Sequence, residues 1–390
     1  MPAFASDRCG ILCAVHHGFR SMQVQGYGYG PLVSSTAQGR YSDGMCRLLG
    51  YSISAARLSL RQVLGPAATS DFRRLSEIHR DGWGVALGGC QGGLDSVGQP
   101  GDQRLYHTTM AAYSDPEFNT LADVPAEVAL WHLRWGSPGI PGIMENVQPF
   151  TYDDMTFIHN GHIASSTGVN ILDDPTFEVD RRTVVAISPH SDSAVVFAVI
   201  AGFVSAGLPL DEAVRRAVAK LRRSYPNASY NCIVCDSDRF VALHATSGAP
   251  TLGEIVNSYA DYGWGGQADD YGDMWYRATG PVESGHRWDT GSPASDTFET
   301  ADDFTAPFGR TQNATDNAHG MGTAGGVEVG GCAVGAEGAV EGDAAVEGAR
   351  GVVVASSGFQ HPQSEGWKAL PNNHMIVSAL ATGDFRIRGL

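Results

Sequence analysis

The chain has 390 residues, of which 43% are hydrophobic and 17% charged, and it contains 49 glycines. This composition predicts a folded protein with a sizeable core and excludes a mainly disordered chain or a coiled coil. The formal net charge is −16, with 26 basic against 42 acidic residues. Because a duplex repels a surface of this sign, we expect no nucleic-acid partner.

Cysteine content and hydropathy indicate where the chain resides. Its seven cysteines are neither dense nor evenly spaced, which favours a reducing cytoplasm over a disulfide scaffold. The apolar run at 11–15 lacks a basic leader and is too short for a signal peptide. The most apolar segment, 194–206, is too short to span a bilayer. We therefore expect a cytoplasmic protein without a membrane partner.

Two segments differ in character from the rest of the chain. Residues 1–45 show no apolar period and are interpreted as an irregular leader, absent from the working protein or removed from it. Residues 281–350 contain 12 acidic and 3 basic residues and much glycine, a composition typical of a disordered insertion. An apolar strand resumes after it. One domain is therefore expected to comprise 46–280 and 351–390.

Helix and strand patterns alternate irregularly between these segments. Ser70 is expected to cap a helix bearing Phe72, Leu75 and Ile78. A nearly all-apolar helix is expected over 194–204, capped by Ser191 or Asp192, and an amphipathic helix over 211–223. Strands are expected at 85–87, 128–134, 155–159, 230–235, 240–244, 352–355 and 374–377, with 230–235 and 240–244 forming a hairpin. The irregular order favours an α+β fold over a doubly wound sheet.

Cys46 is the first candidate for chemistry, because it directly follows Met45. If translation begins at Met45 and that residue is trimmed, Cys46 becomes the N-terminus. Its α-amine would then have an ordinary pKa of about 7.7 to 8 and could accept the proton of its own thiol. Taken alone, a single cysteine is more often a small buried hydrophobe.

Three further positions have side chains suited to binding a substrate. Arg134 ends an apolar strand, and its guanidinium is a natural bidentate partner for a carboxylate. Asn160 and Gly161 end another strand and offer an amide and an unhindered N–H to an oxyanion. Asp192 at a helix start could hold an ammonium group. Each also has an ordinary interpretation: an ion pair with a protein acid, a plain turn, or a helix cap.

In this order, these segments resemble the class II glutamine amidotransferases, a branch of the N-terminal-nucleophile hydrolases. The resemblance extends to MCRLLGY at 45–51, DGWG at 81–84, NVQPF at 146–150, and VVVAS at 352–356 followed by Gly366 and Trp367. It covers roughly 46–278 and 351–390. The opening is similar to that of the stand-alone subfamily, which includes ergothioneine-pathway γ-glutamyl hydrolases and the amidotransferase-like subunit of the glutathione-degrading peptidase.

The resemblance implies a four-layer αββα sandwich that hydrolyses the γ-amide of glutamine or of a γ-glutamyl conjugate without a cofactor. Cys46 would attack the amide carbon, and Asn160 with Gly161 would hold the oxyanion. Arg134 would bind the substrate α-carboxylate and Asp192 its α-ammonium. Trp135 would form a wall of the pocket, although core packing is nearly as good an interpretation. A separate acceptor or peptidase subunit is an expected partner.

Two features depart from the family pattern. The leader would block the Cys46 amine, so activity requires an internal start at Met45 or removal of the leader. If the leader stays, the chain is instead a non-catalytic regulatory or binding subunit. The acidic insertion has no functional interpretation. Cys9 also precedes a Gly-Ile pair typical of other amidotransferases, but the downstream spacing favours Cys46.

A metal site is not expected at the CxxC of Cys232 and Cys235. Residues three apart on a strand point to opposite faces, so these two thiols could not share an ion.

Overall fold

The structure is a computed structural model that describes residues 45–88, 104–137, 140–251, 253–268, 271–279, 349–358, 360 and 362–390. Every described residue belongs to one compact unit within 41–390. The leader up to residue 44 and residues 281–348 lie outside the described residues, so the expectations about both stay predictions. Within the described ranges, no helix is both long and apolar enough to cross a membrane.

Two antiparallel sheets form the centre of the fold. The first has the order β11 (Lys368–Leu370), β9 (Met274–Thr279), β10 (Arg350–Ser356), β1 (Arg47–Ser54), β4 (Val128–Leu133), β2 (Trp83–Gly88), β3 (Arg104–Thr108). The second has the order β13 (Phe385–Gly389), β12 (His374–Ala379), β8 (Arg239–His244), β7 (Asn231–Cys235), β6 (Met155–Asn160), β5 (Phe150–Tyr152).

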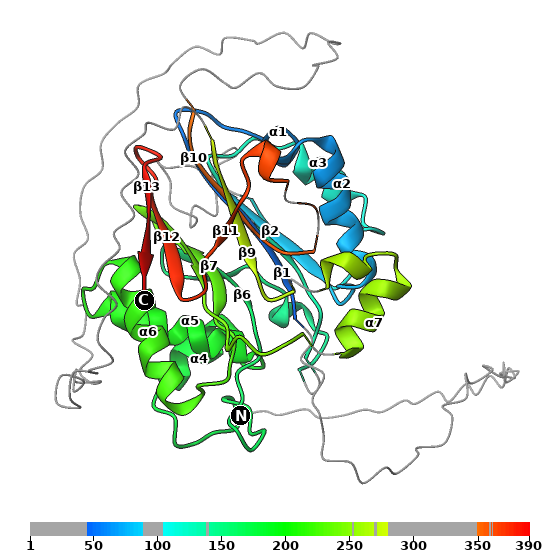
Figure 1. The fold of residues 1–390 in the computed structure, drawn as a ribbon. Helices are drawn as coiled ribbons and strands as arrows, with labels where there is room; N and C mark the ends of the chain where they lie inside the picture. Colours follow the sequence, from blue (N-terminus) through cyan, green and yellow to red (C-terminus); the bar gives the residue numbers. More distant parts are fainter. Residues whose placement is uncertain are drawn as a thin grey trace, which may run out of the picture. The chain divides into compact units, whose positions relative to one another are not determined.

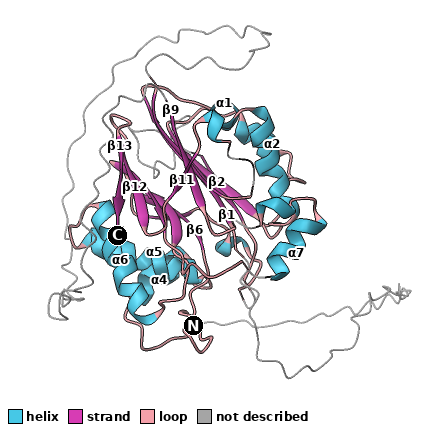
Figure 2. Cartoon of the chain, viewed as in Figure 1, coloured by secondary structure: helices cyan, strands magenta, loops and turns pink. Residues whose placement is uncertain are grey.

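Helices cover the outer face of each sheet (Figures 1 and 2). The first sheet carries α1 (Leu60–Leu64), α2 (Pro66–Arg74), α3 (Glu117–Ala122) and α7 (Gly253–Asp261). The second carries α4 (Arg181–Ile187), α5 (Asp192–Ser205) and α6 (Leu210–Ser224). Short 3₁₀ turns are η1 (Leu75–Glu77), η2 (Met144–Asn146), η3 (Gly265–Gln267) and η5 (Gln363–Glu365). The expected α+β class and four-layer αββα sandwich are confirmed.

Alternation along the strands produces three apolar layers. In β7, Cys232 packs toward the α5 and α6 layer, whereas Ile233 and Cys235 pack between the two sheets. The two thiols therefore lie on opposite faces, as expected. Gly50 in β1 lies where the sheets approach closely, since a Cβ atom there would be 3.1 Å from both Ile233 and Phe240.

The two sides of the segment 281–350 belong to the same sheet. β9 ends at Thr279, and this residue pairs with Gly351 at the start of β10. The apolar strand expected at 352–355 is confirmed as part of β10, and it lies beside β1. The chain therefore returns, after residue 348, to the sheet that it left at residue 279.

The predicted start of the first long helix, at Ser70, is wrong. Ser70 lies inside α2, which begins at Pro66 with Gly65 as its N-cap. Proline favours the first helical position because its ring fixes φ and its missing N–H needs no partner there. Leu75 and Ile78 follow α2, in and after η1, and pack on the same face as Phe72.

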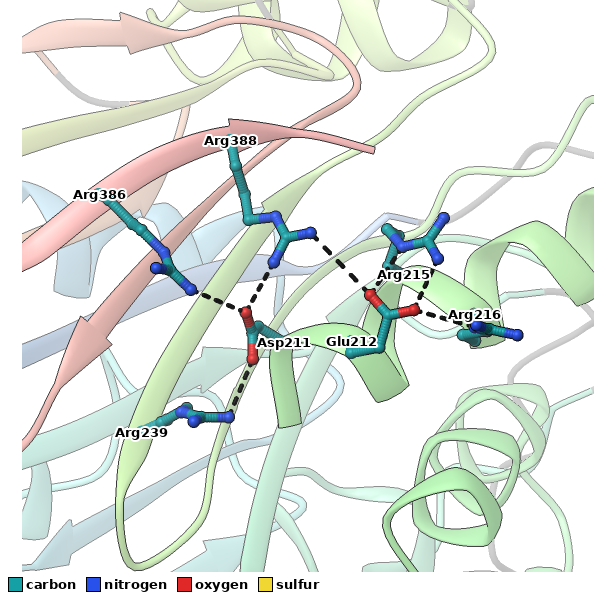
Figure 3. A network of polar contacts seen from close by, with 7 residues as sticks. All are labelled: Asp211, Glu212, Arg215, Arg216, Arg239, Arg386 and Arg388. Atoms are coloured by element: carbon teal, nitrogen blue, oxygen red, sulfur yellow. Dashed lines mark hydrogen bonds and ion pairs between the residues drawn. The ribbon is translucent and has the colours of Figure 1, made fainter. Parts of the chain in front are cut away.

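A charged cluster fixes the start of α6 against the second sheet (Figure 3). The buried Asp211 pairs with Arg239 of β8 at 3.0 Å, and with Arg386 at 3.2 Å and Arg388 at 2.8 Å, both of β13. The neighbouring Glu212 pairs with Arg215, Arg216 and Arg388. These seven residues are called the Asp211 network below. It links α6 to β8 and β13, and the carboxylates of Asp211 and Glu212 pair with arginine side chains.

Candidate active site

Cys46 directly precedes β1, the middle strand of the seven-stranded sheet. Its side chain is partly buried, and its sulfur lies 3.8 Å from the Trp135 carbonyl oxygen. Burial raises the pKa of the thiol to about 11, against the smaller opposing effects of the Trp135 backbone and the Arg134 cation. The thiol is therefore protonated at neutral pH, and a nucleophilic role requires a base that removes its proton.

Arg134 is held next to Cys46 by the register of the sheet. Arg47 of β1 faces Leu133 of β4, so Cys46 and Arg134 follow as neighbours beyond the ends of these strands. The Arg134 N–H donates to the Gly82 carbonyl at 2.8 Å, and the Arg134 carbonyl accepts from the Asp81 N–H at 3.0 Å. The DGWG segment therefore fixes the backbone of Arg134.

The Arg134 guanidinium is buried and contacts backbone carbonyls. It donates to Asp81 at 3.3 Å and to Pro141 at 3.1 Å, and no carboxylate of the described residues forms an ion pair with it. Asn146 of the NVQPF segment donates to the same Pro141 carbonyl at 2.8 Å, which fixes that acceptor. A buried cation without a counter-ion is unfavourable unless a ligand supplies the negative charge.

Asn160 and Gly161 end β6 in the facing sheet. The Asn160 side chain is fully buried, yet neither its Nδ2 nor its Oδ1 has a hydrogen-bond partner in the described structure. A Cβ atom at position 161 would lie 2.1 Å from the Ser229 carbonyl oxygen, so the backbone path admits only glycine. Buried amides are nearly always satisfied, so an unsatisfied one calls for a specific explanation, such as a catalytic role. These features distinguish Asn160 from an ordinary turn residue.

Asp192 is the first residue of α5, and the N-cap position belongs to Ser191, whose side chain makes no capping bond. The carboxylate accepts from the N–H groups of Ile163 at 3.0 Å and Ser193 at 2.9 Å. His162 Nδ1 lies 3.4 Å from it. Burial alone would raise the pKa of Asp192, but His162 and the Ile163 N–H outweigh it and lower that pKa, so the group is ionised.

Cys46, Arg134 and Asp192 come together, since both charges act on the thiol. β6, which includes His159 near its end, lies against β1 and β4 of the first sheet. Asn160 and Gly161 directly follow His159. The structure thus brings the start of β1, the ends of β4 and β6 and the start of α5 to the same end of the sandwich.

Trp135 lies beside the thiol and also lines a cavity of about 160 Å³. The other lining residues are Glu77, Ile78, Arg80, Asp81, Ser258 and Tyr262, so Trp135 is the one predicted site residue among them. Its ring packs edge-on against His79, with centroids 5.5 Å apart. Both expectations for Trp135, pocket wall and packing residue, are compatible with this placement.

Sequence reasoning missed a buried cluster around Arg47, the residue that follows Cys46. Arg47, His79, Tyr259 and Tyr271 are buried together, although they come from four separate segments. Only the position of Arg47 next to Cys46 could have drawn attention to it. Among the residues that the structure describes, no group of three or more metal-ligating side chains occurs.

Comparison with known proteins gives similarity at the level of structure. No protein-family model and no curated protein matches the sequence. A structure described as the allosteric regulatory enzyme of purine biosynthesis matches at 10% identity and TM-score 0.43, covering 88% of this chain and 49% of that one. This chain thus spans about half the length of that enzyme.

Two shorter structures match over nearly their whole length. A glutamine aminotransferase class-II domain protein from Silicibacter pomeroyi is 16% identical, with TM-score 0.38 and coverage of 88% of this chain and 99% of that one. A predicted glutamine amidotransferase from Pseudomonas aeruginosa is 16% identical, with TM-score 0.38 and coverage of 86% and 98%. The chain is thus similar in structure, at low identity, to class II glutamine amidotransferase domains.

Proposed function

We propose that this protein hydrolyses the γ-amide of glutamine or of a γ-glutamyl conjugate, with Cys46 as the nucleophile. The observation that carries the proposal is that two buried polar side chains of the candidate site lack partners. Arg134 is a buried cation without a carboxylate, and Asn160 is a buried amide without a partner. An α-amino acid with a side-chain amide offers the groups that these two residues lack.

Arg134 and Asp192 have opposite charges, and both charges act on the Cys46 thiol. Arg134 binds the substrate α-carboxylate and Asp192 binds the α-ammonium, so the amino-acid end of the substrate is held at two points. The γ-carbonyl then faces Cys46. The Asp192 carboxylate is already fixed by the Ile163 and Ser193 N–H groups, which keeps it in place before the substrate arrives.

Acylation begins when the Cys46 α-amine removes the thiol proton and the sulfur attacks the γ-carbon. A tetrahedral oxyanion forms, and the Asn160 Nδ2 and Gly161 N–H groups donate to it. The C–N bond then breaks, and the proton held on the α-amine passes to the leaving nitrogen. Ammonia or an amine departs and leaves a Cys46 thioester.

Water completes the cycle. The α-amine, now neutral again, takes a proton from a water molecule, whose oxygen attacks the thioester carbon. The C–S bond breaks, the sulfur recovers the proton, and glutamate is released. This cycle needs no oxidant or reductant.

A chain that keeps Met45 would lack the base. The Cys46 nitrogen is then an amide, and the thiol, with a pKa near 11, stays protonated at neutral pH. This is the observation that favours the second candidate, a non-catalytic regulatory or binding subunit. The two candidates therefore differ in the N-terminus of the working protein.

The first experiment is the N-terminal mass of the protein from its native host, combined with assays of glutamate release from glutamine and γ-glutamyl amides. A Cys46 terminus with activity supports the hydrolase. An active chain that retains Met1 would refute the role of the α-amine. An inactive chain that retains Met1 would support the non-catalytic subunit.

The partner and the leaving group belong to the same proposal. We propose that the ammonia is released or passed to a separate acceptor or peptidase subunit. Affinity purification from the native host tests this. Recovery of a partner that uses ammonia would support an acceptor subunit, and recovery of a partner that cleaves peptides would support a peptidase subunit. Recovery of the chain alone would favour a free-standing hydrolase.

A further inference from the structure

Arg47 is a fully buried cation beside the nucleophile. Its Nε donates to the Tyr259 hydroxyl at 2.9 Å and to His79 Nε2 at 3.2 Å, and its Nη1 donates to the Tyr271 carbonyl at 3.1 Å. Its Nη2 has no partner in the described structure, and no described carboxylate forms an ion pair with it. Buried cations are normally paired, so this charge is retained at an energetic cost.

The groups that hold Arg47 do not cancel its charge. The guanidinium carbon lies 3.8 Å from the centre of the Tyr271 ring and 5.8 Å from that of Tyr259. Burial raises the pKa of both hydroxyls, and burial with the Arg47 charge lowers the pKa of His79 well below its usual range. All three are neutral at physiological pH. The cluster therefore carries one uncompensated positive charge.

The chain enters this cluster at the N-terminal side of Cys46. The Tyr271 hydroxyl donates to the Met45 carbonyl at 2.7 Å, and the same carbonyl lies close enough to His79 to raise its pKa against the larger effect of burial. The Met45 carbonyl is therefore held against Tyr271. The Cys46 nitrogen is bonded to that carbonyl carbon, so when Met45 is absent it becomes an α-amine next to the position that Tyr271 contacts.

We propose that Arg47 is a positioning residue that acts through the Cys46 α-amine: its unpaired charge disfavours the ammonium form and keeps the amine free to accept the thiol proton. This inference rests on the proposed function. Two positive charges at short range repel strongly where water is excluded. An amine that is unprotonated near neutral pH can accept the thiol proton directly, without first losing a proton of its own.

The other charges around Cys46 do not replace Arg47. Arg134 and Asp192 also act on this residue, with opposite signs. In the proposed complex, the substrate carboxylate neutralises Arg134 and the substrate ammonium neutralises Asp192. Arg47 then remains as the one uncompensated charge of the three, so its effect persists through the step in which the amine acts as base.

The direct test is a titration of the α-amine in the enzyme that begins at Cys46, labelled with [15N]cysteine and observed by NMR without substrate. The wild-type amine is expected to titrate below its ordinary range of about 7.7 to 8. Arg47→Gln is expected to raise that pKa by about one unit, and Arg47→Lys to leave it near the wild-type value. Arg277→Gln is the matched control, because Arg277 of β9 lies opposite Val353 of β10 and stacks over Trp367, away from Cys46.

Kinetics gives a second readout. The acid limb of the kcat/KM profile should move upward by the same amount in Arg47→Gln, while Arg277→Gln keeps the wild-type limb. An unshifted amine in Arg47→Gln overturns the inference. If Arg47→Gln does not fold, the wild-type enzyme and Arg47→Lys decide. A wild-type amine pKa at or above the ordinary range overturns the inference. A wild-type pKa below that range, with the same value in Arg47→Lys, supports it.

The same measurements separate the two proposals. The amine titration needs no turnover, so a wild-type enzyme that releases no glutamate would refute the proposed function while a shifted amine still supports the role of Arg47. Activity with an unshifted amine in Arg47→Gln would retain the hydrolase and remove Arg47 from its mechanism.

Discussion

The Asp211 network and the Cys46 site both bury charge, but they differ in how that charge is compensated. Asp211 is buried against three arginines, and every contact joins opposite signs (Figure 3). At the Cys46 site, Arg47 and Arg134 donate to carbonyls, a neutral imidazole and a hydroxyl, and the Asn160 side-chain amide has no hydrogen-bond partner among the described residues. A compensated cluster contributes to stability, whereas an uncompensated one holds binding capacity for a ligand.

This difference predicts opposite phenotypes for substitutions in the two regions. Changes at the Cys46 site should reduce activity and leave the free energy of unfolding nearly unchanged. Changes in the Asp211 network should reduce the free energy of unfolding and leave kcat/KM unchanged. The four predictions below test this separation.

The largest effect is expected for Cys46→Ala in the enzyme that begins at this position. Without the sulfur no thioester forms, so glutamate release should fall by at least about 10⁴-fold. Thermal unfolding should stay close to wild type because the side chain is small and partly buried. Cys232→Ala is the matched control, a buried thiol in β7 whose loss should retain turnover. Equal losses in both variants would contradict the assignment of Cys46.

Asn160→Ala should reduce kcat by about 10² to 10³-fold, the usual cost of losing one oxyanion donor. The free energy of unfolding should not fall as it does when a paired polar group is removed, because the Asn160 amide has no partner to lose. Steady-state kinetics and chemical denaturation measure the two quantities. A large loss of stability with unchanged kcat would instead make Asn160 a structural residue.

Much of the fold follows from local patterns. The apolar runs of β6, β7, β8, β10 and β12 and the faces of α5 and α6 predict those elements within a few residues of their bounds. β1 was missed because its sequence, RLLGYSIS, is buried along its whole length and shows no polar alternation. The start of α2 was misplaced because Ser70 was taken as the helix cap, whereas the helix begins earlier, with Gly65 as N-cap and Pro66 at its first position.

Only part of the candidate site could be predicted from local sequence patterns. Arg134 directly follows a strand and Asp192 begins a helix that the sequence indicates, whereas Cys46 was found only because it follows Met45. The charges of Arg134 and Asp192 both act on the Cys46 thiol. The cluster around Arg47 draws on His79, Tyr259 and Tyr271, which are far apart in the chain and carry no shared spacing. Only the packing of α7 and the segment before β9 onto β1 makes them neighbours. Tertiary contacts of this kind leave no periodic signal in a single sequence.

Asp211→Asn should lower the free energy of unfolding by about 2 kcal/mol, less than the loss for a fully buried pair, because the three arginines can turn toward water. Their side chains are 31% to 62% exposed, whereas that of Asp211 is 5% exposed. Denaturant titration measures the change. Glutamate release per folded molecule should equal that of wild type, and a parallel loss of kcat would show that the two regions are coupled.

The smallest effect concerns Glu212 and the pH dependence of stability. Hydrogen bonds from Arg215 and Arg216 lower the pKa of this carboxyl from 4.5 to about 2 despite its partial burial. Since the folded pKa lies below the unfolded one, the carboxylate stabilises the fold above pH 4.5, and this contribution is lost as the pH falls toward 2.

Wild type and Glu212→Gln should therefore differ by about 1 kcal/mol at neutral pH and converge in strong acid. Unfolding curves at a series of pH values measure the difference, with the exposed Glu254 of α7 changed to glutamine as the control. A difference between wild type and Glu212→Gln that stays constant down to pH 2 would mean that packing, and not charge, carries the contribution of Glu212. The Asp211 network would then hold fewer compensated charges than its geometry indicates, and its contrast with the Cys46 site would rest on Asp211 alone.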